Sequence, residues 1–355
     1  MQDLLIPDET DLELVHALQA APRATWHELG RSLGVDPATA TRRWQGLVEA
    51  GSARVTAYPD VRLWAQDHCN AFVELDLQPT ARAHAVEVLS RVPQIASISI
   101  VSSGRDLFLT VLTPDLATLS RLVLQKLQQL PGLRGTRTHA ITTVYGEGNH
   151  WRLDALSPRR RVHVPLKAGN RPVWKDHHRA VLRALDDGRI PAADIAARTA
   201  RSGSTVRRWL NEMIDGGLLS LRCEVAQPIT GWPVAATFWA RVPPNELHRT
   251  ATALTELPEV RLCAATTGAD NLVMTLWLRS LGDIQRLEAE LAGKLPALTL
   301  TDRAVTLHAA KRMGCLLDDT GRITDVVPID PWATVTPPSA AMNHPADGGA
   351  PHADR

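Results

Sequence analysis

The sequence predicts an α+β fold in which one module, a winged helix-turn-helix followed by a ferredoxin-like βαββαβ domain, occurs twice. Two internal matches support this prediction. The segment at 28–53, ELGRSLGVDPATATRRWQGLVEAGSA, matches DIAARTARSGSTVRRWLNEMIDGGLL at 194–219, with Gly51 aligned to Gly217. Farther along, SISIVSSGRDLFLTVLTPDL matches RLCAATTGADNLVMTLWLRSL, with Gly104 aligned to Gly268. Solenoid repeats have periods of roughly 20–50 residues, so spacings this long indicate a duplicated two-domain module.

Composition narrows the class of protein. The 355 residues predict about two to four domains. The net charge of +1 supplies no overall positive field, so any surface that binds nucleic acid must be local. Four scattered cysteines without a CxxC motif argue against disulfides and zinc and favour a cytoplasmic location. We expect no signal peptide and no membrane partner, because the chain lacks a long apolar run.

Residues 1–66 predict the first helix-turn-helix domain, which consists of three short helices and a strand. The first helix follows Thr10, and the second ends at Gly34. The third begins at Asp36-Pro37, where an N-capping carboxylate precedes proline at the first helical position. Gly51 is placed to end that helix, and the strand RVTAY follows.

Residues 67–150 predict the first ferredoxin-like domain. Apolar and polar residues alternate over 71–77, as in a half-buried strand. The elements expected after it are a helix at 80–91, strands at 97–101 and 107–112, a helix from Asp115 to about 130, and a strand at 136–145. This order is β-α-β-β-α-β, the split βαβ pattern.

The remaining boundaries follow from the repeat. Residues 151–172 predict a basic linker, whose Arg159, Arg160 and Arg161 form either a solvated loop or a phosphate contact. The second helix-turn-helix is expected at 173–228 and the second ferredoxin-like domain at 229–312. A C-terminal extension follows at 313–355, and its Pro/Ala/Gly-rich composition predicts disorder beyond about 332.

The third helix of each helix-turn-helix domain carries the residues expected to read DNA. Val206, Leu210 and Met213 form an apolar stripe, and Ala40, Trp44 and Leu47 take the matching places in the first copy. The opposite face then offers an arginine for guanine and an amide for adenine in both copies. The predicted DNA-contacting residues, including flanking phosphate contacts, are Thr39, Thr41, Arg42, Gln45, Ser204, Thr205, Arg207, Arg208 and Asn211. The alternative is a solvated polar face.

With these residues in place, the chain resembles the Lrp/AsnC (feast/famine) family of bacterial transcription regulators. The resemblance rests on GVDPATATRRWQGLVEAG and ARSGSTVRRWLNEMIDGG, and on the turns within VSSGRDLFLTV and ATTGADNLVMTL. It implies a ligand-sensing (RAM-type) ferredoxin-like domain, homo-oligomers formed through these domains, and no cofactor. It also implies that a small effector binds near Gly104, Asp106, Gly268 and Asp270. The alternative for these residues is a plain turn with glycine at positive φ.

A carboxylate and free backbone N–H groups at one turn suit a ligand with both an ammonium group and a carboxylate. We therefore expect an amino acid as effector. We also expect the two ferredoxin-like sheets of one chain to pack together, because each has an apolar face for its sister to cover.

The sequence also bears on three alternative functions. Siroheme decarboxylases share this pair of folds, but His68 lacks the neighbouring arginine and glycine of their His-Arg-x-x-Gly segment. A metal enzyme is disfavoured because the adjacent His177 and His178 are expected on different faces of a helix. A ligand-binding or oligomerising module that has lost DNA binding stays open. The sequence thus predicts a DNA-binding regulator rather than an enzyme.

Overall fold

The computed structural model describes residues 7–149, 151–153 and 173–335. The three linker arginines and most of the tail predicted to be disordered lie outside these residues. The four cysteines are unpaired. Within the described part of the chain, no helix combines the length and the apolar character that a membrane span needs.

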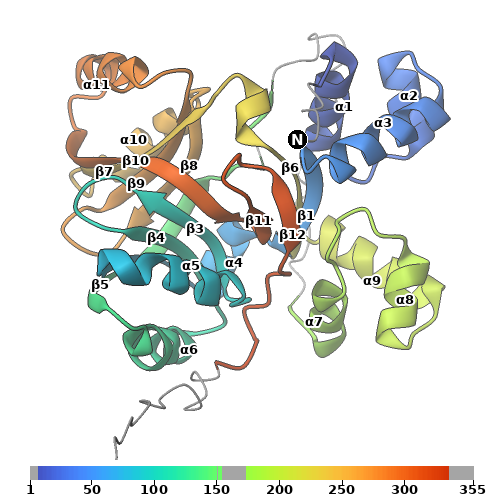
Figure 1. The fold of residues 1–355 in the computed structure, drawn as a ribbon, viewed down its shortest axis with the longest axis horizontal. Coiled ribbons are helices and arrows are strands. Elements are labelled where there is room, and N and C mark those ends of the chain that lie inside the picture. The colour runs from blue at the N-terminus through green and yellow to red at the C-terminus, as the bar shows by residue number, and fades with distance from the viewer. Residues whose placement is uncertain (1–6, 150, 154–172, 336–355) are drawn as a thin grey trace, which may run out of the picture.

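Two three-helix units form the part of the molecule on the right of Figure 1. The first contains α1 (Glu9–Ala20), α2 (Trp26–Leu33) and α3 (Pro37–Glu49), and the second contains α7 (Asp176–Arg183), α8 (Ala192–Thr199) and α9 (Gly203–Asp215). Both third helices are capped as predicted. The Asp36 carboxylate accepts a hydrogen bond from the Ala38 N–H at 2.8 Å, and the Ser202 hydroxyl accepts one from the Thr205 N–H at 3.2 Å.

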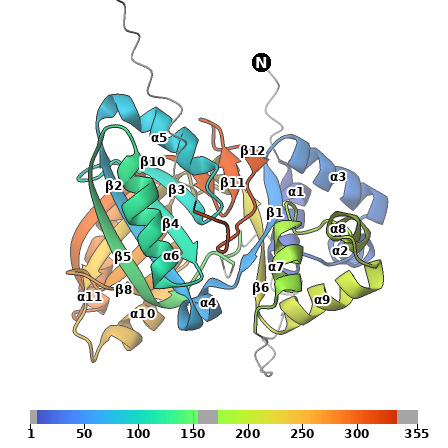
Figure 2. The same cartoon turned by 90° about the horizontal axis from the view of Figure 1, so that it is seen from below.

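A two-stranded ribbon connects both helical units to the rest of the molecule. Strand β1 (Ala53–Pro59) follows α3, and β6 (Leu219–Val225) follows α9. The two strands pair antiparallel with each other. The strand predicted after each helix-turn-helix therefore pairs with its sister, and the ribbon lies between the helical units and the large sheet (Figure 2).

The first ferredoxin-like unit has the predicted order of elements. It contains β2 (Cys69–Leu77), α5 (Arg82–Ser90), β3 (Ile95–Val101), β4 (Leu107–Thr113), α6 (Leu116–Arg121) and β5 (Leu133–Gly146). The expected helix from Asp115 to about 130 continues beyond α6 as a π-helical turn and then a 3-10 turn. One short helix was not predicted, α4 (Val61–Asp67), whose first turn is capped by the Asp60 carboxylate.

The second ferredoxin-like unit repeats this order. It contains β7 (Val234–Arg241), α10 (Leu247–Thr255), β8 (Val260–Thr266), β9 (Leu272–Leu278), α11 (Gly282–Lys294) and β10 (Thr299–Arg312). Both units place their helices on one face of their sheet, over cores built largely of leucine and valine. The other face of each sheet is turned toward the sister unit.

The two sheets of the chain join along both edges and close into a barrel. Strand β5 pairs with β8, and β10 pairs with both β3 and β7. The strands therefore follow one another around the barrel in the order β3-β4-β2-β5-β8-β9-β7-β10 and return to β3. This arrangement confirms that the sheets pair within one chain. It also shows that strand edges, and not only apolar faces, make the junction.

The C-terminal extension packs back on the first helical unit. Strands β11 (Cys315–Leu317) and β12 (Ile323–Val326) extend the sheet beyond β10. The Ile323 N–H donates to the Gly51 carbonyl at 2.9 Å. Farther along, the Trp332 ring lies 4.8 Å from Trp64 and 5.0 Å from Trp174, measured between ring centroids. The extension thus contacts the residue that ends α3.

Replacing Gly51 with alanine is expected to destabilise the protein more than the same change at Gly34. Both glycines have positive φ, 65° and 73°, so both variants carry backbone strain of about 1–2 kcal/mol. A Cβ on Gly51 would also lie 2.5 Å from the Ile323 carbonyl oxygen, whereas one on Gly34 would meet no atom within 4 Å. Urea unfolding of both variants tests this. Equal losses in the free energy of unfolding would show that the contact between β12 and Gly51 does not contribute to stability.

Candidate nucleic-acid interface and effector turns

The apolar stripes of α3 and α9 are buried, as predicted. Ala40, Trp44 and Leu47 pack within the first helical unit, and Val206, Leu210 and Met213 pack within the second. Burial of these stripes turns the opposite faces of both helices outward.

In the first unit, Arg42 and Gln45 are exposed on α3, and Thr39 and Thr41 are half-buried. The Thr41 hydroxyl donates to the Pro37 carbonyl at 2.9 Å. Arg42 and Gln45 therefore form an outward-facing pair. Thr41 is already committed to its own helix.

In the second unit, four of the predicted contact residues are exposed on α9, namely Ser204, Arg207, Arg208 and Asn211. Thr205 is half-buried, and its Oγ1 lies 2.8 Å from the Ser202 hydroxyl at the cap. Within the described part of the chain, neither Arg207 nor Arg208 has a hydrogen-bond or ion-pair partner, and the same is true of Arg42. These three guanidinium groups remain free to contact another molecule.

The two units differ in charge. Residues 7–50 carry four arginines against seven carboxylates, whereas residues 174–217 carry eight basic side chains against six acidic ones. One arginine of the first unit is also neutralised, because Arg43 pairs with Asp8 at 2.8 Å and Asp11 at 2.9 Å. Its counterpart, Trp209, stacks on the His177 ring at 4.4 Å between centroids. The second unit therefore presents the more positive surface.

The prediction that His177 and His178 cannot share a site is wrong in its geometry. The ligand atoms of both histidines and of Glu212 on α9 lie within 4.8 Å of one another. The helix begins at Asp176. In its first turn the two histidine rings pack edge to face, with centroids 4.2 Å apart. The Lys175 ammonium group lies 3.2 Å from the Glu212 carboxylate and already supplies it with a cation.

Asp106 lies at the turn between β3 and β4, where its carboxylate has partners within the chain. It accepts a hydrogen bond from the Leu77 N–H at 2.7 Å and pairs with Arg82. Burial raises the pKa of Asp106, but these two partners and nearby Arg134 outweigh it and hold the pKa below its usual value. The side chain thus closes the turn, beside a hollow lined by both arginines.

The matching turn in the second unit is built differently. Asn271, rather than Asp270, takes the place of Asp106, because its side-chain oxygen accepts from the Val242 N–H at 2.9 Å. Both turns have five residues, 102–106 and 267–271, but glycine is third in the first turn and second in the other, so an alignment that starts from the glycines is shifted by one residue. Gly104 and Gly268 both have positive φ. Asp270 accepts from the Thr266 hydroxyl through its backbone carbonyl, at 3.0 Å.

Arg105 points into the barrel instead of toward solvent. Its guanidinium group lies 3.0 Å from the Glu74 carboxylate and 2.7 Å from the Asp302 carboxylate of the sister unit. It also covers the Trp239 ring at 3.9 Å. The residue that distinguishes the first turn therefore joins the two ferredoxin-like units.

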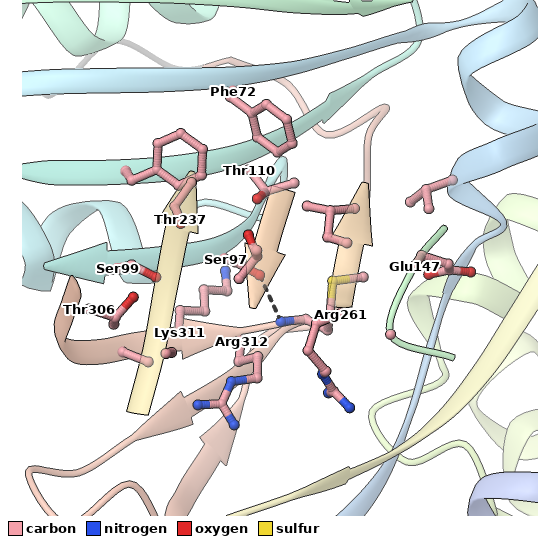
Figure 3. A pocket seen from close by; sticks show the side chains of 18 of the residues that line it. Phe72, Ser97, Ser99, Thr110, Glu147, Thr237, Arg261, Thr306, Lys311 and Arg312 are labelled. Atoms are coloured by element: carbon pink, nitrogen blue, oxygen red, sulfur yellow. Dashed lines mark hydrogen bonds between the residues drawn. The ribbon is translucent and has the colours of Figure 1, made fainter. Parts of the chain in front are cut away.

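The barrel interior contains functional candidates that sequence reasoning missed. A cavity of about 130 Å³ lies inside it, and Arg222, Arg261 and Arg312 line that cavity from three different strands. Figure 3 shows Arg261 and Arg312 on its wall. The available signal was weak. In β8, Arg261 is a charged residue on a strand of otherwise uncharged residues, VRLCAAT. Nothing local to any of these strands shows that the three arginines meet.

Two three-helix units, joined by a ribbon to paired ferredoxin-like units, give the arrangement of a duplicated helix-turn-helix protein. Comparison with known proteins agrees. The AsnC-type helix-turn-helix domain matches residues 8–48, and the Lrp/AsnC ligand binding domain matches residues 70–149 and again 235–314. The chain belongs to the Lrp/AsnC family of transcriptional regulators.

Relatives with a single module match part of the chain. An uncharacterised HTH-type transcriptional regulator of Pyrococcus abyssi is 30% identical over 137 residues, which cover 39% of this chain and 87% of that protein. The transcriptional regulator AzlB of Bacillus subtilis is 23% identical over 137 residues, covering 38% of this chain and 87% of that protein. Both comparisons relate a single module to a regulator.

Among solved structures, the siroheme decarboxylase NirDL, in complex with an iron-uroporphyrin III analogue, is similar over most of the chain. The likeness covers 92% of this chain and 97% of that protein, with a TM-score of 0.55 and 15% identity. At this identity the comparison establishes a shared fold, in which both proteins carry the duplicated arrangement.

Proposed function

We propose that this regulator binds double-stranded DNA sequence-specifically, with α3 and α9 as its two reading helices. The observation that supports this proposal is that Arg42 with Gln45, and Arg208 with Asn211, lie exposed at equivalent positions of two capped helices. An arginine and an amide on one helix face suit guanine and adenine in the major groove. Because the two heads differ in sequence and charge, the site they read is asymmetric, with half-sites about 10 bp or a multiple apart.

The proposal includes an amino-acid effector at the two turns and a cytoplasmic location without a cofactor. In the hollow beside Asp106, Arg82 and Arg134 offer partners for a carboxylate, and Asp106 offers one for an ammonium group. Assembly of several chains through the ferredoxin-like units also belongs to the proposal. The edge strands of the two ferredoxin-like sheets pair with each other within the chain, so contacts between chains would use the outer surfaces of these units. Leu307, beside the first turn, is 66% exposed on such a surface.

Genome-wide DNA footprinting with the purified protein, with and without a panel of amino acids, tests binding, site and effector together. We expect protected sites that share an asymmetric sequence and whose occupancy changes with one amino acid. Protection spread uniformly over all DNA sequences at every salt concentration would contradict the proposal, and so would the absence of any protection.

Calorimetry with Asp106→Asn provides a sharper test of the effector site. The asparagine keeps an oxygen that accepts from the Leu77 N–H, as Asn271 does for Val242, so the turn should fold normally. It removes the negative charge that would hold an ammonium group, and amino-acid affinity should fall by about 10-fold or more. Asp270→Ala removes the second predicted carboxylate. If both variants bind the amino acid as tightly as the wild type, the turns are structural only.

Siroheme decarboxylation is the alternative function, and it rests on likeness of fold. His68 is the histidine of the segment where that activity would place one. Its ring packs against Trp64 at a tilt of 40°, with centroids 3.9 Å apart, and its Nδ1 lies 3.2 Å from the Pro114 carbonyl oxygen. This position serves packing between α4 and the end of β4. Anaerobic incubation with siroheme tests the alternative, since release of carbon dioxide would overturn the assignment as a regulator without enzymatic activity.

A further inference from the structure

The cavity inside the barrel has a charged end and an apolar end. Phe72 and Phe108 form part of the apolar wall, and their rings stack with centroids 5.1 Å apart. The charged end is lined by Arg222 of β6, Arg261 of β8 and Arg312 of β10. Figure 3 shows the last two of these arginines. A volume of about 130 Å³ is far more than one water molecule requires.

Arg261 is the least satisfied of the three arginines. It is only 6% exposed, and its Nη1 is buried without a hydrogen-bond partner among the described residues. Its guanidinium group stacks over Trp277 at 3.9 Å and over Trp151 at 4.5 Å. Stacking on aromatic rings offsets part of the lost hydration, but it supplies no acceptor for the N–H groups.

The partners of the two neighbouring arginines leave the positive charge of Arg261 uncompensated. Arg222 pairs with Glu224 at 2.6 Å. Arg312 donates to the Val225 carbonyl at 3.4 Å and to the Gln227 side-chain oxygen at 3.3 Å, which are uncharged and distant acceptors. Three guanidinium groups therefore share the paired carboxylate of Glu224.

Among the described residues that line the cavity, Glu147 carries the carboxyl group; it is buried, and burial together with Asp60 raises its pKa to about 7. It is thus largely protonated below neutral pH. Buried charges in proteins are normally paired, and here the three guanidinium groups outnumber the single Glu224 carboxylate that is paired with Arg222.

We propose that the barrel cavity binds a small carboxylate with an apolar body, whose carboxylate lies against Arg261 and Arg312 and whose body lies against Phe72 and Phe108. A guanidinium group matches a carboxylate with two parallel N–H donors. A dry cavity of similar size holds one benzene ring, so the ligand has roughly six to nine non-hydrogen atoms. A tetrapyrrole is far too large for this cavity.

Occupancy of this site would reach the DNA-reading helices through the ribbon. Arg222 lies on β6, opposite Thr56 of β1, and each ribbon strand follows directly from α3 or α9. A ligand that favours one geometry of the ribbon would shift the spacing of the two heads. This regulatory role rests on the proposed DNA-binding function, whereas binding of the carboxylate does not.

Calorimetry and thermal unfolding of the full chain test the site, with benzoate and 3-methylbutanoate as probes and benzamide as the neutral control. We expect saturable binding of a carboxylate, with a melting temperature that rises with its concentration, and no effect of benzamide. Arg261→Met keeps the bulk of the side chain but removes the charge, and it should weaken binding by on the order of 10- to 100-fold. Arg279→Met, an exposed arginine stacked on Trp232, is the matched control and should bind like the wild type.

The melting temperature without ligand shows whether Arg261→Met folds. If its charge is uncompensated in the empty protein, the variant should melt no lower than the wild type. No heat with either carboxylate, or equal affinity in Arg261→Met and the wild type, would overturn the proposal. Leucine separates it from the turn sites, because leucine binding that is lost in Asp106→Asn and retained in Arg261→Met would support the proposed effector turns alone.

Discussion

Arg208→Ala is expected to weaken binding to the target DNA by about 10- to 100-fold, equivalent to roughly 1–3 kcal/mol, and to relax specificity at one half-site. The reason is that Arg208 is exposed on the reading face of α9 and has no partner within the described part of the chain. Arg42→Ala should do the same at the other half-site. Fluorescence anisotropy with target and random duplexes measures both effects.

Arg207→Ala should behave differently from Arg208→Ala. As a predicted phosphate contact, it should weaken binding to target and random DNA alike and reduce the slope of log affinity against log salt by about 1. The loss from Arg208→Ala should exceed that from Arg42→Ala, because the first head carries more carboxylates than arginines. Arg249→Ala serves as the control, since Arg249 is exposed on α10. If the reading-helix variants and this control all bind like the wild type, α3 and α9 do not read DNA.

Glu147→Gln is expected to stabilise the protein above pH 7 and to have little effect near pH 5. The carboxyl group is buried, and burial and the nearby Asp60 raise its pKa to about 7, against the opposing effect of Arg222 and Arg62. The Tyr58 hydroxyl donates to it at 2.9 Å. When a carboxyl group has a higher pKa in the folded state than in the unfolded state, its protonated form contributes to the stability of the folded protein. This contribution is complete at pH values below the pKa of the unfolded state. That contribution is lost as the pH rises through the folded value.

The difference between wild type and Glu147→Gln should therefore grow from about pH 5 to pH 8 and reach on the order of 3 kcal/mol. Urea unfolding at intervals across this range measures it. Glu28→Gln is the control of opposite sign, because the Thr25 backbone N–H holds the pKa of that exposed carboxylate below its usual value. Parallel pH profiles for wild type and Glu147→Gln would mean that Glu147 stays ionised.

Local patterns were sufficient for the elements and their order. Capping residues and a terminal glycine placed α3 and α9, and the apolar stripe through Trp44 and Leu210 identified their outward faces. These features depend on neighbours three or four residues away, which the sequence displays directly. The duplicated order of elements then predicted that the two sheets would meet within one chain. The helix α4 was missed because its cap, Asp60, lies in a short segment without clear periodicity.

Contacts between distant strands required the tertiary structure. Closure of the barrel depends on β5 meeting β8 and on β10 meeting β3, and no local pattern encodes which edges pair. Closure brings Arg261 of β8 and Arg312 of β10 to one cavity, to which the ribbon strand β6 adds Arg222, and it turns Arg105 toward Asp302. The structure also shows that Asn271 takes the place of Asp106, since each is the last residue of a five-residue turn, whereas the two glycines lie at different positions within their turns. The outward faces of α3 and α9 were thus set by local sequence, whereas the three arginines meet at one cavity only because three separate strands converge.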